Sequence, residues 1–274
     1  MTSERFLRQT ISKSEMERRY KAVREMMKKR KLDLLVIQQP FGSYWAGALR
    51  YLTNTMSGLE GTNLIFPIDG DITMISHRDA PPPAMRELYG ISDWRGVGMN
   101  SQFNFVEDAK FVAEVLKERR PNAIGLVNLP LMQAIFYDRL LRELPRNIWI
   151  EDATPAFDEI RWVKSEEEIK LCEQAAAMND IGIEACEKAL KPGIKENEVA
   201  AQVIRAVWEA GSDGQLIGFG TAPAGETCTM DMAPTWVRTI KDGDISVCMV
   251  ECSGTGGYFT ETARMICMGR IPKD

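Results

Sequence analysis

The feature that most constrains this chain is a pair of β-prone apolar segments, residues 244–252 and 258–268, joined by a short loop. The loop, residues 253–257, reads Ser-Gly-Thr-Gly-Gly. Two such segments on either side of a short glycine-containing loop are typical of a β-hairpin. We therefore predict an antiparallel hairpin within residues 241–269.

Each strand of this hairpin carries one glutamate on its apolar face. Because side chains alternate between the two faces of a strand, Glu251 and Glu261 each share a face with the apolar residue two positions earlier. A loop centred on Thr255 would place Glu251 opposite Phe259. Glu261 would then lie diagonal to Glu251, at a separation that long side chains can span. An unpaired charge on an apolar face is costly, so we predict that the two carboxylates share a cation, a proton or an arginine.

The hairpin also resembles a known metal site. Its order of residues is similar to that of the metal-site hairpin of the creatinase / Xaa-Pro aminopeptidase / methionine aminopeptidase superfamily, whose catalytic domain has the pita-bread fold. In that family two aspartates of the hairpin bind a pair of divalent metals. The second aspartate matches Glu261, whereas the first falls at Val250, next to Glu251. The matching elements are Gly243-Asp244, Gly257-Tyr258, Glu261 and Arg264.

This resemblance implies a hydrolase of the Xaa-Pro aminopeptidase or creatinase type, acting on a C–N bond of a small amide, a dipeptide or an amidine. Glu251 and Glu261 would bind a divalent metal, with manganese, cobalt or zinc as candidates, or would act as a general acid–base pair. Arg264 would neutralise or orient Glu261. These three residues are the predicted catalytic residues, and the two glutamates are the predicted metal ligands.

Two other interpretations stay open on the sequence alone. The chain could be a non-catalytic pita-bread module that binds peptides, or a pseudo-enzyme in which Glu251, Glu261 and Arg264 are a relict buried ion pair. The histidine count favours these interpretations, because the family's usual site histidines are absent and the sequence contains one histidine, His77. His77 follows a strand-like segment, where it is a general base, part of a loop that enters a neighbouring subunit's site, or a solvated residue at a strand end.

The sequence before the hairpin predicts an α/β fold. Helical and strand-like patterns alternate, for example in an amphipathic helix over 105–119 followed by a strand over 123–127. Such alternation favours a partly parallel sheet covered by helices. A further helix is predicted over 196–210, and together with the helix before it this pair resembles the two long helices that back the pita-bread sheet.

A second domain is predicted to start near residue 160. The segment 164–169, Lys-Ser-Glu-Glu-Glu-Ile, resembles the start of the family's second domain, and its Ser165 and Glu168 form a capping box. We therefore predict a creatinase-like N-terminal α/β domain over residues 1–158. Residues 159–274 are predicted to be the first half of a pita-bread, aminopeptidase-like α+β domain.

The resemblance also implies that part of the site lies elsewhere. The family's second half supplies a metal-binding histidine and two further glutamates, and it would follow residue 274. We therefore expect this chain to be the front portion of a longer protein and to be inactive as it stands. Replacement of the missing half by dimerisation is the alternative.

Composition and charge argue against several other classes of protein. The net charge of −5 does not indicate the positively charged surface that nucleic-acid binding requires. No apolar run approaches the about 18 residues of a membrane span, and the first residues contain no apolar leader segment. We therefore expect a cytoplasmic protein that acts on a small molecule or short peptide and, from the resemblance, forms a homodimer. The six cysteines are expected to be buried, reduced thiols.

Overall fold

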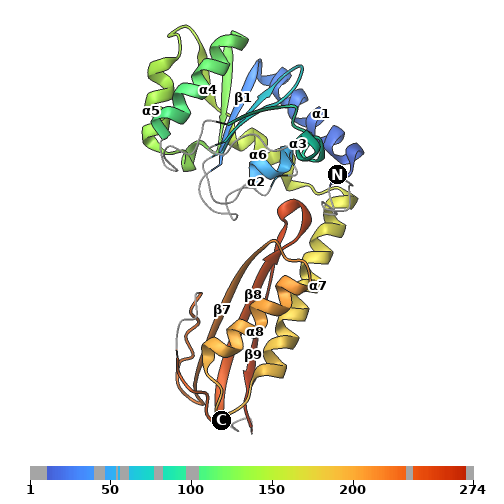
Figure 1. The fold of residues 1–274 in the computed structure, drawn as a ribbon, viewed down its shortest axis with the longest axis vertical. Helices are drawn as coiled ribbons and strands as arrows, with labels where there is room; N and C mark the ends of the chain where they lie inside the picture. Colours follow the sequence, from blue (N-terminus) through green and yellow to red (C-terminus); the bar gives the residue numbers. More distant parts are fainter. Residues whose placement is uncertain are drawn as a thin grey trace. The chain divides into compact units, whose positions relative to one another are not determined.

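The computed structural model describes residues 11–39, 47–53, 55, 62–76, 83–96, 105–232 and 237–269. It divides the chain into two compact units, residues 1–164 and 165–274, each with its own sheet (Figure 1). The predicted boundary between residues 158 and 159 falls inside helix α6 (Thr154–Trp162), which belongs to the first unit. His77 lies outside the described residues.

The first unit is built on a six-stranded mixed sheet with the strand order β4-β3-β2-β1-β5-β6. Strand β2 is antiparallel to both β1 and β3, whereas the pairs β1/β5, β3/β4 and β5/β6 are parallel. The strands are β1 (Leu34–Gln39), β2 (Thr62–Pro67), β3 (Thr73–Ser76), β4 (Asp93–Gly96), β5 (Ala123–Val127) and β6 (Trp149–Asp152).

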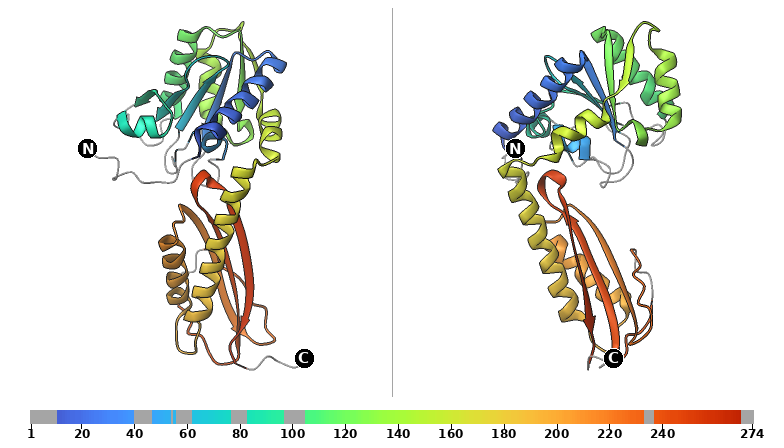
Figure 2. Two further views of the ribbon diagram at one scale, coloured as in Figure 1. Left: turned by 90° about the vertical axis from the view of Figure 1, so that its right-hand side faces the viewer. Right: turned by 180° about the vertical axis from the view of Figure 1, so that it is seen from behind.

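Helices cover both faces of this sheet (Figure 2). On β1, Leu34 and Val36 join the core formed with α4 and α5, whereas Leu35 and Ile37 join the core formed with α1, α2 and α6. All six residues of β1 are buried, as expected for a strand with helices on both sides. The helices are α1 (Lys13–Arg30), α2 (Gly47–Leu52), α3 (Pro83–Leu88), α4 (Phe105–Arg119), α5 (Ala134–Glu143) and α6, with a short 3₁₀ turn η3 (Leu129–Leu131).

The predicted α/β fold is thereby confirmed, and the predicted helix over 105–119 and strand over 123–127 have the bounds of α4 and β5. Both segments have a clear local signal. The helix has an apolar stripe, and the strand is a short apolar run that is buried along its whole length. Within the described residues, no helix is both long and apolar enough to cross a membrane.

The second unit consists of two helices packed on one face of a three-stranded antiparallel sheet (Figure 2). The strand order is β7-β8-β9. Gly182 lets α7 approach the sheet and α8 closely, because a Cβ at this position would lie 2.9 Å from both Val207 and Val250. The elements are α7 (Glu166–Ala189), α8 (Glu196–Glu209), β7 (Gly214–Pro223), β8 (Asp244–Ser253), the 3₁₀ turn η4 (Thr255–Gly257) and β9 (Phe259–Cys267).

The predicted hairpin is confirmed as β8-η4-β9, but its register differs from the prediction. Ser253 pairs with Phe259, so the hairpin is centred on Gly256 and not on Thr255. The physical reason lies in the loop: Gly256 and Gly257 both adopt positive φ values, 83° and 75°, which glycine reaches without steric cost. With both glycines in this conformation, the loop between the paired residues Ser253 and Phe259 contains five residues, 254–258. The predicted opposition of Glu251 and Phe259 is therefore wrong.

All six cysteines are free thiols. Cys186, Cys248 and Cys252 are buried, whereas the other three are half-buried. The prediction that all six are buried is therefore correct for Cys186, Cys248 and Cys252 and wrong for the three half-buried cysteines.

Candidate functional site

The two predicted site glutamates face each other across the hairpin. In the ladder of β8 and β9, Glu251 pairs directly with Glu261. Residues directly opposite in an antiparallel pair have Cβ atoms roughly 4.5–5.5 Å apart, which is closer than the predicted diagonal relation. Glu251 is half-buried and Glu261 is exposed. The structure therefore pairs the two residues more closely than the sequence indicated.

The glutamates lie on the face of the sheet that is opposite to α7 and α8. Val250 and Cys248 of β8 belong to the core formed with these helices, so alternation turns Glu251 to the other face. We call this other face of β7-β8-β9 the open face. Its described residues include Met249, which is buried, and Met265, which is 70% exposed.

Part of the open face is covered by the chain itself. The segment 229–232 passes over β7, where a Cβ at Gly220 would lie 1.9 Å from the carbonyl oxygen of Thr229. A Cβ at Gly218 would meet the sulfur of Met230 at 2.5 Å. Because both positions are glycines, the segment can lie directly on the strand.

No partner among the described residues balances the charge of the carboxylate pair. Within the described part of the chain, neither Glu251 nor Glu261 makes a hydrogen bond or an ion pair. Like charges directly opposite each other in a sheet are destabilising. A bound cation is the simplest way to relieve this repulsion, since it would interact with both carboxylates at once.

Arg264 does not take the role that the family motif suggested for it. It lies three residues after Glu261, and an odd separation along a strand places two side chains on opposite faces. Arg264 pairs with Cys248 in the ladder, and its Nη1 donates to the carbonyl oxygen of Ala263 at 2.7 Å. The expectation that Arg264 neutralises Glu261 is therefore not met by the geometry.

As metal ligands, the two glutamates fit the chemistry of a divalent cation but do not enclose one. Carboxylate oxygens are hard donors of the kind that manganese and other divalent cations accept. The described residues contain no group of three or more His, Cys, Asp or Glu side chains that could hold a metal ion. Glu251 and Glu261 are thus two possible ligands of a site that needs more.

A buried polar network, which the sequence interpretation did not identify, lies behind the pair on the helix side. Asn179 of α7 has no exposed surface. Its Nδ2 donates to Thr260 Oγ1 at 2.9 Å, and its Oδ1 accepts from Cys252 Sγ at 2.8 Å. Burial raises the pKa of Cys252 to about 11, so its thiol stays protonated and can donate at neutral pH. The one signal in the sequence is that Asn179 interrupts the apolar stripe of its helix.

A second contact ties α7 to the end of the hairpin. The Tyr258 hydroxyl donates to Glu168 Oε1 at 2.5 Å. Glu168 also accepts from the backbone N–H of Ser165, and Ser165 Oγ accepts from the backbone N–H of Glu168, which completes the predicted capping box. The same glutamate therefore caps the helix and holds the turn of the hairpin.

The Gly243-Asp244 element of the family motif has a structural role here. Asp244 is buried, and it accepts from Arg238 Nη1 at 2.6 Å and from the backbone N–H of Lys241 at 2.7 Å. The hydrogen bond from Arg238 holds the pKa of the Asp244 carboxyl below its usual range, and the Lys241 N–H adds to this effect against the cost of burial. Asp244 therefore fixes the segment that leads into β8.

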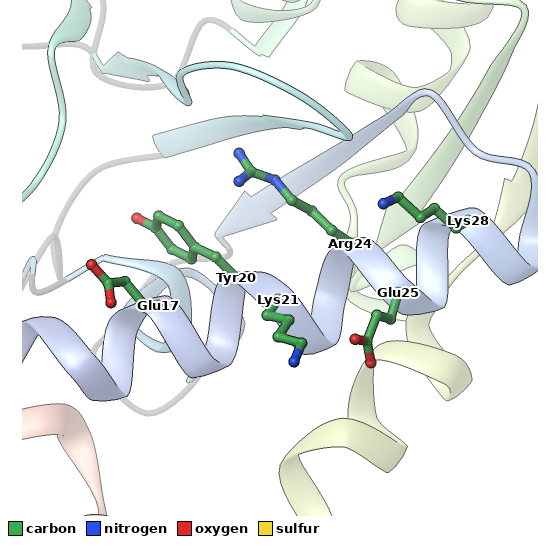
Figure 3. A pocket seen from close by; sticks show the side chains of 6 residues that line it. All are labelled: Glu17, Tyr20, Lys21, Arg24, Glu25 and Lys28. Atoms are coloured by element: carbon green, nitrogen blue, oxygen red, sulfur yellow. The ribbon is translucent and has the colours of Figure 1, made fainter.

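The first unit contains a hollow of about 360 Å³ on the surface of α1 (Figure 3). Two of its polar groups are bonded within the unit: the Tyr20 hydroxyl donates to the carbonyl of Leu52, and Arg24 Nη2 donates to the carbonyl of Gly70. The residues that line it are Glu17, Tyr20, Lys21, Arg24, Glu25 and Lys28.

Comparison with known proteins finds a family match over a segment that contains the hairpin. Residues 170–274 match the model of metallopeptidase family M24, a segment that holds both glutamates and most of the second unit. The chain is 27% identical, over 97% of its length, to the uncharacterized hydrolase/peptidase y4tL of Sinorhizobium fredii. It spans 68% of that relative's length.

Solved structures share the fold over most of the chain. The X-Pro aminopeptidase from Thermotoga maritima MSB8 superposes with a TM-score of 0.72 at 14% identity, over 93% of this chain and 66% of its own. The dipeptidase PepE from Mycobacterium ulcerans superposes with a TM-score of 0.65 at 21% identity, over 97% of this chain and 68% of its own. This chain thus spans about two thirds of the length of these proteins.

The fold and the family match agree with the resemblance that the hairpin motif suggested. Metallopeptidases of family M24 use divalent metals in general, which is consistent with the uncompensated pair of carboxylates. The chain has the pita-bread fold of the Xaa-Pro aminopeptidases and prolidases, and residues 170–274 of its second unit match the model of metallopeptidase family M24.

Proposed function

We propose that this protein is a hydrolase of the Xaa-Pro peptidase type and that Glu251 and Glu261 are two ligands of its divalent metal. The substrate is a dipeptide or small amide whose C–N bond is cleaved. The observation that carries the proposal is the directly opposed pair of carboxylates, without hydrogen bond or ion pair among the described residues, inside the segment that matches family M24.

The chain's own contribution is to hold two glutamates directly opposite each other in the hairpin. When bound, a divalent cation polarises a scissile carbonyl and lowers the pKa of a bound water toward ~7. Glu251 lies on the central strand of the sheet, between Leu216 of β7 and Glu261 of β9, so its backbone is fixed from both sides. The pair supplies two ligands, and the proposal requires further ligands besides these.

The direct test is hydrolysis of Xaa-Pro dipeptides. The purified protein is incubated with Ala-Pro or Gly-Pro, with manganese, cobalt or zinc, and free proline is measured. With the further ligands in place, we expect proline release that a chelator abolishes and added metal restores, whereas residues 1–274 by themselves are expected to be inactive. Glu251→Gln and Glu261→Gln should each lower turnover by about 100-fold or more, since even outer-shell partners of a metal cost 10–100-fold. Glu173→Gln, an exposed glutamate of α7, is the control and should leave turnover unchanged.

Other outcomes would replace the proposal in defined ways. Proline release that a chelator does not affect would remove the metal from the mechanism. Peptide binding with neither turnover nor metal binding would establish the non-catalytic binding module, which the lack of a three-ligand group among the described residues favours as the second candidate. The homodimer stays a prediction from the resemblance.

A further inference from the structure

We infer that Asn179 is a positioning residue, which fixes the register of β8 and β9 so that Glu251 lies directly opposite Glu261. Asn179 contacts the residue next to each glutamate: Cys252 follows Glu251, and Thr260 precedes Glu261. Cys252 and Thr260 are themselves a ladder pair, so one buried amide holds both strands at the level of the carboxylates from behind. The role of the pair as metal ligands rests on the proposed function, whereas the register does not.

The hydrophobic pattern alone does not fix this register. A slip by one residue would turn the buried Cys248 and Val250 to the open face, and burial excludes it. A slip by two residues keeps every side chain on its own face. Besides the turn at Gly256 and Gly257, side chains that recognise one residue of the partner strand can exclude such a slip.

Two contacts of α7 exclude the two possible slips together. A slip that moved Tyr258 opposite Cys252 would leave Asn179 without its threonine. A slip that moved Thr262 opposite Cys252 would offer Asn179 a threonine, but it would break the bond from Tyr258 to Glu168. The helix therefore selects one register through Asn179 and Glu168, 81 and 90 residues away from their partners on the hairpin.

Burial makes this selection effective. Water does not reach the contact between Asn179 and Cys252, because neither residue has any exposed surface. In a wrong register the amide of Asn179 would lose its partners where water cannot replace them, and an unsatisfied buried polar group is costly. The buried amide thus discriminates between registers in the way that a single buried asparagine does in a coiled coil.

The test compares the full chain with three variants. Asn179→Leu removes both hydrogen bonds. Asn179→Leu combined with Cys252→Ala and Thr260→Val also removes the orphaned partners, which should restore most of the lost melting temperature because no polar group is left unsatisfied. Ser246→Ala is the control. It removes another buried hydroxyl from the helix-side face of β8, one that donates to the carbonyl of Ile266 and lies five residues from Glu251 (251 − 246).

Two readouts are measured on each protein: nuclear Overhauser contacts between backbone protons of β8 and β9, and affinity for manganese. We expect Asn179→Leu and the triple variant to show a second set of cross-strand contacts, in which Glu251 faces a residue other than Glu261. Both should bind manganese more weakly, by about 10–100-fold. Ser246→Ala should keep the contacts and the affinity of the unmodified protein.

Recovery of stability in the triple variant together with a single native register would overturn the inference, because it would show that Asn179 only fills the core. If the unmodified protein does not bind manganese, the proposed metal site fails, and the cross-strand contacts alone decide the role of Asn179. The two failures are therefore distinguishable in one set of samples.

Discussion

The two faces of the sheet β7-β8-β9 differ in whether their polar side chains have hydrogen-bond or ion-pair partners. On the helix side, every charged or polar group discussed above has a partner: Asp244 has Arg238, Glu168 has Tyr258, and Asn179 has Cys252 and Thr260. On the open face, Glu251 and Glu261 face each other without one among the described residues. Within the described residues, the same sheet thus has one face whose polar groups have partners and one face whose carboxylate pair has none.

This difference indicates which face is structural and which is chemical. Satisfied buried polar groups stabilise a unique packing, whereas like charges held together without compensation destabilise the fold unless a ligand relieves them. Sites of function are where a structure retains such local conflicts. The contrast therefore points to the open face at Glu251 and Glu261.

The largest contrast is expected between apolar residues on the two faces. Phe219 of β7 is fully buried in the core with the helices, so Phe219→Ala should lower the free energy of unfolding by about 3–5 kcal/mol. Met265 of β9 is 70% exposed on the open face. Met265→Ala should therefore change the free energy of unfolding by less than about 0.5 kcal/mol. Denaturant unfolding measures both. Equal losses would show that the open face is packed as tightly as the helix side.

The second prediction concerns the buried ion pair that leads into β8. Asp244→Asn should cost about 2 kcal/mol at neutral pH, because it weakens a buried hydrogen bond to a charged group. The folded state lowers the pKa of Asp244, so its contribution is present above the unfolded value of ~3.9 and is lost as the pH falls through the lower folded value. The difference between the two proteins should therefore shrink below about pH 4.

Unfolding measured from neutral to acidic pH checks this dependence. Asp180→Asn, on the exposed side of α7, is the matched control and should have little effect at any pH. A difference for Asp244→Asn that is constant with pH would mean that its charge does not contribute to folding.

The third prediction concerns the contact that ties the hairpin turn to α7. Tyr258→Phe removes the hydroxyl that donates to Glu168 and should lower the free energy of unfolding by about 1.5 kcal/mol. Tyr137→Phe on α5 is the control, because the Tyr137 hydroxyl has no hydrogen bond within the described residues. Similar losses in thermal melts of the two variants would contradict the assigned role of the Tyr258 hydroxyl.

The smallest effect has the opposite sign. With metal removed by a chelator, Glu261→Gln should raise the free energy of unfolding by about 0.2–1 kcal/mol, because it removes the repulsion between directly opposed carboxylates. With saturating manganese the order should reverse, since the bound cation stabilises only the folded protein that keeps both ligands. A Glu261→Gln protein that is less stable in both conditions would show that the carboxylate has a structural partner.

Much of the fold could be predicted from the sequence because its signals are local. The helix over 105–119, the strand over 123–127 and the capping box of Ser165 and Glu168 each depend on residues within one turn or one strand. The register of the hairpin could not be predicted in the same way. It depends on the positive φ of Gly256 and Gly257, and a glycine-rich sequence allows several loop conformations.

The candidate site was predictable in part. The two glutamates were identified, because acids on the apolar face of a strand are unusual. The face of Arg264 followed from simple alternation, but the family motif suggested a different role. The contacts of Asn179 could not be derived, since they join residues 73 and 81 positions apart, and their partners depend on the tertiary packing of α7 on the sheet.

Calorimetric titration of the full chain with manganese measures whether the open face binds a divalent cation through Glu251 and Glu261. We predict saturable binding that Glu251→Gln and Glu261→Gln each weaken by about 100-fold or more, beyond the usual cost of losing an outer-shell partner. Glu173→Gln should bind as the unmodified protein does. Equal affinity in all four proteins would contradict the account, because it would place the cation away from the hairpin.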